Sequence, residues 1–201
     1  MRLIKTNSRI DLAVGLYPNG RTFNHPWKFE VHDNFLSDGL AQYLLSLNLT
    51  PPEKNMRGED MKLNEALVHG IRVQAEQKLN ITEDLWFRVG LHHAAPDNKY
   101  PWHEDHISKK HSCVVYLGNN GTGTILGHPQ ELRDEYEVLW RDNRALYFQR
   151  EHKLSWHRFE SGGRPRLTLI MYWMTENFSV QTKQDMKYNQ LHYMTLPPRQ
   201  K

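Results

Sequence analysis

The chain has 201 residues, of which 38% are hydrophobic and 24% are charged, and this balance is typical of a globular protein rather than a disordered one. The basic residues behind its formal net charge of +3 are scattered, so nucleic acid is not an expected partner. No apolar run reaches the roughly eighteen residues of a membrane span, and the segment "MRLIKTNSRIDLAVG" lacks the apolar core of a signal peptide. We therefore expect a cytoplasmic protein with no membrane partner. It should fold as a single domain over residues 1–201, and its oligomeric state is left open.

Residues 27–49, "WKFEVHDNFLSDGLAQYLLSLNL", predict a strand followed by a helix. Phe29 and Val31 alternate with polar residues, and apolar residues then recur at positions 36, 40, 44, 45 and 47 with helical spacing. The hydroxyl of Ser37 is expected to cap this helix, with Asp38 near the positive end of the helix dipole. After a polar loop, residues 60–79 carry one apolar stripe and predict a second helix.

From residue 84 the pattern changes to short segments rich in β-branched and aromatic residues, separated by turn formers. This change predicts an α+β protein with a double-stranded β-helix (jelly-roll) core backed by the N-terminal helices. Residues 176–201 are polar and are expected to form a C-terminal tail or a lid over a site. The segments interpreted as strands are 84–94, 111–118, 122–128, 136–140, 144–149, 154–160 and 166–173.

The stretch "YPWHEDH", residues 100–106, is the first candidate site. On an extended strand His103 and Asp105 point to the same side while Glu104 points away. Two histidines and one carboxylate form the ligand set of non-haem Fe(II) oxygenases. Because His-x-Asp alone also fits a solvated polar loop, a third ligand is required. The later strand "LSWHRFE" supplies His157, which a sandwich can bring alongside.

A carboxylate-binding pair follows His157. Arg166 and Thr168 lie two residues apart and share one face of a strand, so a guanidinium and a hydroxyl can bind the same acid. The planar guanidinium suits the distal carboxylate of 2-oxoglutarate. Arg164 is the competing residue, but it precedes Pro165 and is therefore expected in the turn.

On these residues the chain resembles the Fe(II)- and 2-oxoglutarate-dependent dioxygenase superfamily, particularly its prolyl-4-hydroxylase-like branch. The resemblance covers most of the chain and is carried by "FEVHDNFLSDGLAQYLL", "YPWHEDH", "SCVVYLGNNGTGTIL" and "WHRFESGGRPRLTLIMYW". It implies His103, Asp105 and His157 as iron ligands, and Tyr116, Arg166 and Thr168 as contacts of 2-oxoglutarate, with Arg166 counted among the catalytic residues. The chain departs from the family where paired glycines are replaced by "GTGT" and where a turn glycine is replaced by Asn143, a residue that also tolerates a left-handed conformation.

The resemblance implies an enzyme that uses Fe(II), 2-oxoglutarate and O2 and releases succinate and CO2. Its substrate would be a prolyl residue in a peptide, an amino acid or another small molecule, chosen by loops such as 49–60, 94–101 and 128–135. One alternative is a non-catalytic jelly-roll protein that binds a metal or a small acid. A nucleic-acid demethylase of the same superfamily is disfavoured, because that branch has a second arginine where this chain has Tyr172. Among the other histidines, His92 and His93 are expected to line the pocket, and His106 and His111 to lie at its rim or on the surface.

Overall fold

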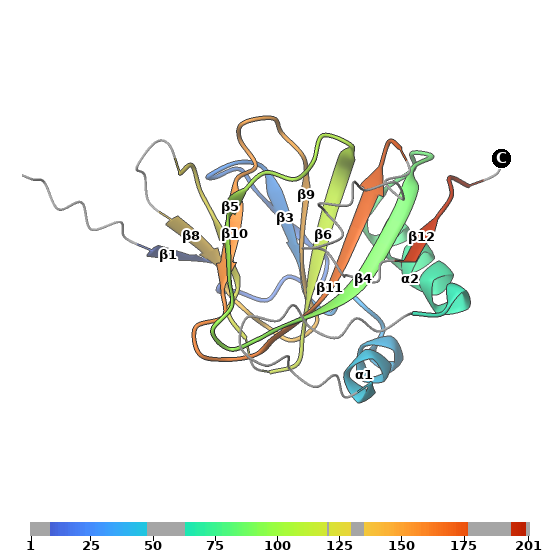
Figure 1. Cartoon of the computed structure of the whole chain (residues 1–201), viewed down its shortest axis with the longest axis horizontal. Coiled ribbons are helices and arrows are strands. Elements are labelled where there is room, and N and C mark those ends of the chain that lie inside the picture. The colour runs from blue at the N-terminus through green and yellow to red at the C-terminus, as the bar shows by residue number, and fades with distance from the viewer. Residues whose placement is uncertain (1–8, 48–62, 120, 130–134, 177–193, 200–201) are drawn as a thin grey trace, which may run out of the picture.

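The computed structural model describes residues 9–47, 63–119, 121–129, 135–176 and 194–199. Within these ranges the chain forms twelve strands and two helices (Figure 1). In chain order they are β1 (Arg9–Leu12), β2 (Arg21–Phe23), β3 (Phe29–His32), α1 (Asp38–Ser46), α2 (Glu65–Leu79), β4 (Trp86–Ala94), β5 (Lys99–His103), β6 (Lys109–Leu117), β7 (Thr124–Leu126), β8 (Glu135–Val138), β9 (Arg144–Gln149), β10 (His157–Glu160), β11 (Arg166–Met174) and β12 (Met194–Leu196).

The strands form two facing sheets. The minor sheet has the order β1-β8-β7-β10-β5, and the major sheet has the order β12-β4-β11-β6-β9-β3-β2. Both helices lie beside the major sheet, on the side away from the minor sheet (Figure 1). The predicted jelly-roll core backed by helices is therefore confirmed, and each of the seven segments interpreted as strands from residue 84 onward overlaps an observed strand.

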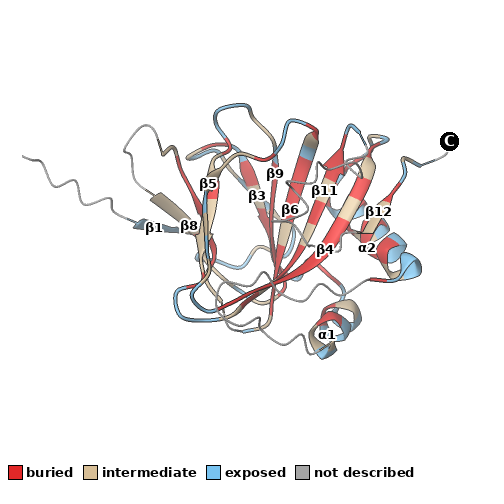
Figure 2. Ribbon diagram, viewed as in Figure 1, coloured by how far each residue is buried: buried red, intermediate tan, exposed pale blue. Residues whose placement is uncertain are grey.

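The central strands of the major sheet are buried on both faces (Figure 2). One face packs against apolar residues of α1 and α2, with Val89, Val115 and Met171 among its members. The opposite face meets the minor sheet through residues such as Tyr116 and Phe148. Alternate side chains of one strand thus enter different cores, and the face between the two sheets is the one that carries the candidate site.

The N-terminal cap of α1 differs from the prediction. Ser37 precedes α1, but its hydroxyl makes no capping hydrogen bond, so the predicted side-chain cap is wrong. Its backbone N–H instead donates to Gln74 Oε1 of α2 at 3.1 Å, which ties the two helices together. In α2 the capping residue is Asn64, whose Oδ1 accepts a hydrogen bond from the Leu67 N–H at 2.8 Å. Residues 60–62 of the predicted second helix lie outside the described ranges.

Two further strands precede the helices and were not expected from the sequence. β1 pairs in parallel with β8 of the minor sheet, and β2 pairs with β3 at the edge of the major sheet. Both are only three or four residues long and mostly exposed, so their sequences are too short to distinguish a strand from a loop.

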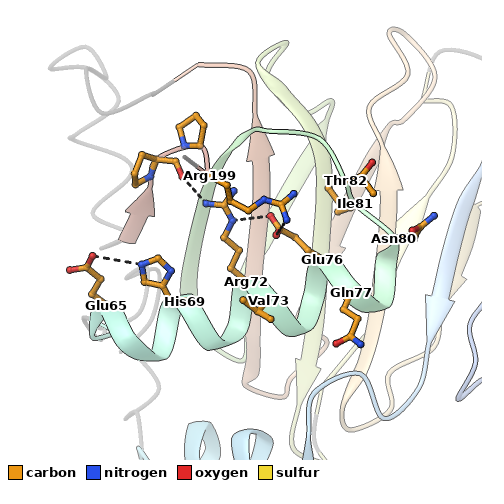
Figure 3. A pocket seen from close by; sticks show the side chains of 12 residues that line it. Glu65, His69, Arg72, Val73, Glu76, Gln77, Asn80, Ile81, Thr82 and Arg199 are labelled. Atoms are coloured by element: carbon orange, nitrogen blue, oxygen red, sulfur yellow. Dashed lines mark hydrogen bonds and ion pairs between the residues drawn. The ribbon is translucent and has the colours of Figure 1, made fainter. Parts of the chain in front are cut away.

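The end of the chain is anchored beside α2. β12 pairs with β4, and Arg72 Nη1 donates to the Pro197 carbonyl at 2.6 Å (Figure 3). Glu76 accepts from Arg72 Nε at 2.8 Å and lies 3.4 Å from Arg199. These residues line a cavity of about 650 Å³ that contains none of the predicted site residues. Residues 177–193 of the expected tail or lid lie outside the described ranges, and neither described helix is long and apolar enough to cross a membrane.

A buried ion pair joins the N-terminal segment to both sheets. Arg144 donates to both carboxylate oxygens of Asp33, at 2.7 and 2.9 Å, and to the carbonyls of Ala13, Gly15 and Leu139. Asp33 also accepts the Tyr17 N–H at 2.6 Å. Burial alone raises the pKa of Asp33, but the hydrogen bonds from Arg144 and Tyr17 outweigh it and hold that pKa below its ordinary value.

Replacing Asp33 with alanine should destabilise the protein by about 3–5 kcal/mol, because the buried Arg144 guanidinium would lose its only anionic partner in the described network. The free energy of unfolding from urea titration measures this loss. Asp38→Asn, an exposed change in the first turn of α1, is the control and should cost less than about 1 kcal/mol.

The same titration has a defined pH dependence. A carboxyl group with a lowered pKa stabilises the fold above its ordinary pKa, and this contribution is lost as the pH falls. The stability difference between the wild type and Asp33→Ala should therefore shrink below about pH 4. A difference that stays constant down to pH 2 would contradict the assigned role of Asp33.

Candidate functional site

The register of β5 and β10 brings two of the predicted ligands together. His103, the last residue of β5, is the direct antiparallel partner of His157, the first residue of β10, and their ring centroids are 4.2 Å apart. Asp105 lies two residues beyond the end of β5. Each of these three residues offers one ligand atom, and the three atoms lie within 4.8 Å of one another. Glu104 points away, toward Arg150 and His152.

Backbone carbonyls fix the orientation of both imidazoles. His103 Nδ1 lies 3.0 Å from the Pro101 carbonyl, and His157 Nδ1 lies 3.0 Å from the Ser155 carbonyl. Because a carbonyl oxygen only accepts, each Nδ1 must carry the proton, which leaves the Nε2 lone pair for a metal. This is the tautomer that a ligating histidine requires.

The charge states also suit metal ligation. Burial, followed by the neighbouring His157, lowers the pKa of His103 to about 3, and burial likewise lowers the pKa of His157. Burial opposes ionisation of Asp105, but the charge of Lys109 and the hydrogen bonds from Lys109 and Ser112 outweigh it and hold the pKa of Asp105 well below the ordinary range. Two neutral imidazoles and one carboxylate therefore face one point, and this donor set fits Fe(II).

Arg166 opens β11 and is buried, with 3% of its surface exposed. Its Nε donates to the Thr122 carbonyl at 3.1 Å and its Nη2 donates to Thr124 Oγ1 at 3.0 Å. No carboxylate of the described residues forms an ion pair with it, although a buried guanidinium is costly without an anion. The carboxylate of 2-oxoglutarate fits this position.

Tyr116 and Thr168 lie beside Arg166 on the same face of the major sheet. Thr168 is paired with Tyr116 of β6 and with His92 of β4, and both Thr168 and Tyr116 are fully buried. The Tyr116 hydroxyl donates to Thr124 Oγ1 at 3.0 Å, so Tyr116 and Arg166 share Thr124 as a partner. Tyr116, Arg166 and Thr168, the three residues predicted to bind 2-oxoglutarate, therefore lie next to one another in the structure.

Arg164 lies in the turn before β11, as its position before Pro165 predicts. It is exposed, and its N–H donates to the Ser161 carbonyl at 3.1 Å. Arg164 is therefore separated from the buried face that carries Arg166.

Aromatic residues that the sequence analysis did not assign to the site enclose the arginine and link it to the histidines. The Arg166 guanidinium carbon lies 4.4 Å from the ring of Phe159 and 5.8 Å from the ring of Trp140. Phe159 stacks with Tyr100 at 5.9 Å, and Tyr100 meets His103 at 4.5 Å. Phe159 could have been found, because it follows His157 by two residues on one strand. Trp140 gave no such signal, since only the fold brings it over Tyr116.

One expectation about the remaining histidines is wrong. His111 is buried rather than at the rim or surface, because its ring lies between the Tyr147 hydroxyl at 2.8 Å and Glu83 at 2.5 Å. It belongs to the face of β6 that packs toward α2. Asn143 does adopt a left-handed conformation, with φ of 55°, as expected for a residue in the place of a turn glycine.

No family model matches the sequence, and no curated protein matches it. Solved structures do match the fold. A prolyl-4-hydroxylase from Pseudomonas putida has a TM-score of 0.53 and 18% identity, covering 74% of this chain and 93% of its own. The viral collagen prolyl hydroxylase from Paramecium bursaria chlorella virus 1, solved with 2-oxoglutarate, has a TM-score of 0.55 and 16% identity. The match covers 74% of this chain and 96% of the viral enzyme.

A third structure, an oxidoreductase of the 2OG-Fe(II) oxygenase family from Burkholderia pseudomallei, has a TM-score of 0.55 and 16% identity, covering 74% of this chain and 85% of its own. The fold is therefore that of the 2-oxoglutarate- and Fe(II)-dependent oxygenases. Two of these three structures are prolyl hydroxylases, so the resemblance to the prolyl-4-hydroxylase-like branch is confirmed at the level of the fold.

Asp105→Ala should weaken the binding of Mn²⁺, a redox-stable substitute for Fe(II), by roughly a hundredfold or more, because removal even of a residue that only supports a ligand costs about 10–100-fold in affinity. Isothermal titration calorimetry measures the affinity, and circular dichroism should show an intact β-rich fold. Glu104→Ala is the matched control, since Glu104 points away from the triad. Wild-type affinity in Asp105→Ala would remove Asp105 from the ligand set.

Arg166→Ala should raise the 2-oxoglutarate concentration needed for half-saturation about a hundredfold, since hydrogen bonds to charged groups contribute roughly 1.5–3 kcal/mol. Arg164→Ala, two residues away in the exposed turn, should change it little. Titration of both variants with 2-oxoglutarate makes the comparison. The reverse ranking would mean that the acid binds outside the buried pocket.

Proposed function

We propose that the protein is an Fe(II)- and 2-oxoglutarate-dependent dioxygenase that hydroxylates a prolyl residue, an amino acid or another small molecule, with release of succinate and CO2. The proposal is supported chiefly by one observation. His103, Asp105 and His157 converge on one point, while a buried arginine without a carboxylate partner among the described residues lies on the adjoining wall.

Each part of the site has a separate task in this proposal. His103, Asp105 and His157 would hold the iron through two Nε2 atoms and one carboxylate oxygen. Arg166 would bind the distal carboxylate of 2-oxoglutarate, with Tyr116 and Thr168 shaping the same end of the pocket. When bound, iron with 2-oxoglutarate and O2 supplies the oxidative decarboxylation to succinate and the transfer of one oxygen atom to a substrate C–H bond.

The protein also has to keep water from the cosubstrate. Phe159, Trp140 and Tyr116 surround the guanidinium of Arg166, so the carboxylate would be bound in an apolar enclosure where a charge-assisted hydrogen bond is strong. Tyr116 remains protonated as a hydrogen-bond donor, because burial raises its pKa.

A prolyl substrate is favoured by the matched prolyl hydroxylases. Part of the loops expected to choose the substrate, residues 49–60 and 130–134, lies outside the described ranges. A cytoplasmic location and the absence of nucleic-acid and membrane partners remain part of this proposal.

The activity test has two stages. Under oxygen-free conditions the protein should bind Fe(II) first and 2-oxoglutarate second, both saturably, and on exposure to air it should form succinate. A mass-shift screen of amino acids, proline-rich peptides and host metabolites should then reveal one class that gains a single oxygen atom. Asp105→Ala serves as the inactive control in both stages.

The same experiment distinguishes the proposed dioxygenase from the two alternative functions. A non-catalytic jelly-roll protein would bind the metal or the acid but form no succinate with any substrate. A nucleic-acid demethylase would act on methylated bases and leave proline-rich peptides unchanged.

A further inference from the structure

Strand β6 changes the direction of its side chains at its beginning. From His111 to Leu117 the odd-numbered residues face the helices, with Cys113, Val115 and Leu117 in that core, and the even-numbered residues face the minor sheet. The pairing of β6 with β11 then shifts by one residue, because Trp173 is opposite His111 but Met174 is opposite Lys109. Lys110 is the extra residue of a β-bulge, a feature that re-aims side chains.

The bulge has a visible effect on three consecutive residues. Lys110 and His111, which would otherwise point to opposite faces, both contact Glu83, at 2.7 and 2.5 Å. Lys109 consequently points to the other face, where Ser112 and the candidate metal site lie. Its ammonium nitrogen is 2.6 Å from Asp105 Oδ1.

Both oxygens of the Asp105 carboxylate are therefore occupied by donors. Ser112 Oγ donates to Oδ2 at 2.5 Å, and Lys109 donates to Oδ1 at 2.6 Å. Ser112 is buried in the middle of the major sheet and its position is set by strand pairing. The Lys109 side chain is 22% exposed and has a flexible stem, so it is the partner that can move.

We propose that Lys109 is a positioning residue that controls metal binding at the triad, because its ammonium pairs with Asp105 Oδ1 and competes with a divalent cation for that carboxylate. This inference rests on the proposed function, since it takes His103, Asp105 and His157 as the ligands. In this role Lys109 acts through Asp105. It lowers the affinity for the metal and supplies a counter-charge to Asp105 whenever the metal is absent.

Tyr172 provides a place for the displaced ammonium. The Lys109 nitrogen lies 3.6 Å from the centroid of the Tyr172 ring, so a cation–π interaction can hold the lysine while Asp105 binds the metal. A positive charge that stays this near also opposes a divalent cation by direct repulsion. Displacement and repulsion both predict that removal of the lysine charge strengthens metal binding.

The test compares Mn²⁺ binding in the wild type with that in Lys109→Met and Lys109→Gln, by calorimetry on protein stripped of metal with a chelator. The dissociation constant should fall at least fivefold in both variants. Lys109→Gln keeps a hydrogen-bond donor for Asp105, so it provides a folded variant if Lys109→Met is unstable. Lys109→Arg, which keeps the charge, should stay within about twofold of the wild type.

A second measurement excludes a merely structural role. Without metal, the charge-removing variants should unfold at a lower temperature than the wild type, because Asp105 is buried without its cation. With saturating Mn²⁺ this deficit should be reduced or reversed. Lys110→Met is the matched control, since the neighbouring lysine pairs with Glu83 on the other face and should leave Mn²⁺ affinity unchanged.

The outcomes distinguish this inference from the proposed function. If the wild type binds Mn²⁺ and the charge-removing variants bind it equally or more weakly, the role of Lys109 is wrong while the oxygenase proposal stands. If neither the wild type nor any variant binds Mn²⁺, the proposed function itself fails.

Discussion

The pairing of β10 with β5, in the register that sets His157 opposite His103, is the constraint on which the candidate site depends. These residues are far apart in the sequence, and only a cross-strand pair holds two imidazoles at a ring separation of 4.2 Å. A slip of one residue would turn His157 to the other face of the minor sheet. The carbonyls of Pro101 and Ser155, which orient the rings, are supplied by the same two chain segments.

Among the described residues, the buried charges that bear on the sheets and on the candidate site fall into three kinds. Asp33 and Arg144 satisfy each other within a closed network that joins the N-terminal segment to the sheets. Asp105 forms an ion pair with Lys109, whose side chain is partly exposed. Arg166 donates hydrogen bonds to the Thr122 carbonyl and the Thr124 hydroxyl, and no carboxylate of the described residues forms an ion pair with it. Since an uncompensated buried charge reduces stability, the third kind points to an anionic ligand, whereas the first kind serves the fold. For Asp105 the reason to expect a ligand is different: its carboxylate lies beside two histidines that could hold a metal with it.

Much of the fold could be predicted, because the spacing of apolar residues within each short segment indicates a strand or a helix. The alternation of apolar residues marked the strands of the core, and helical spacing marked α1 and α2. The two short strands β1 and β2 could not be predicted, because they are largely exposed and are stabilised by pairing with distant segments. The Ser37 cap was wrong for a similar reason: its N–H binds Gln74 of another helix, a contact that local sequence does not reveal.

The sequence by itself determined the residue types and spacings of the site: His103 and Asp105 two apart, His157 on a later strand, and Arg166 and Thr168 on one strand face. Strand alternation is sufficient for Arg166 and Thr168, which both lie on β11. Asp105 lies beyond the end of β5, and the choice of the three ligands also depended on the resemblance to the dioxygenase superfamily. Only the tertiary structure decided that Trp140 lies beside Arg166 and that His111 is buried. It also decided the direction of Lys109, because a β-bulge interrupts the two-residue period at Lys110 and places that ammonium on Asp105. Such an interruption arises from pairing with β11, and the residues of β6 alone carry no sign of it.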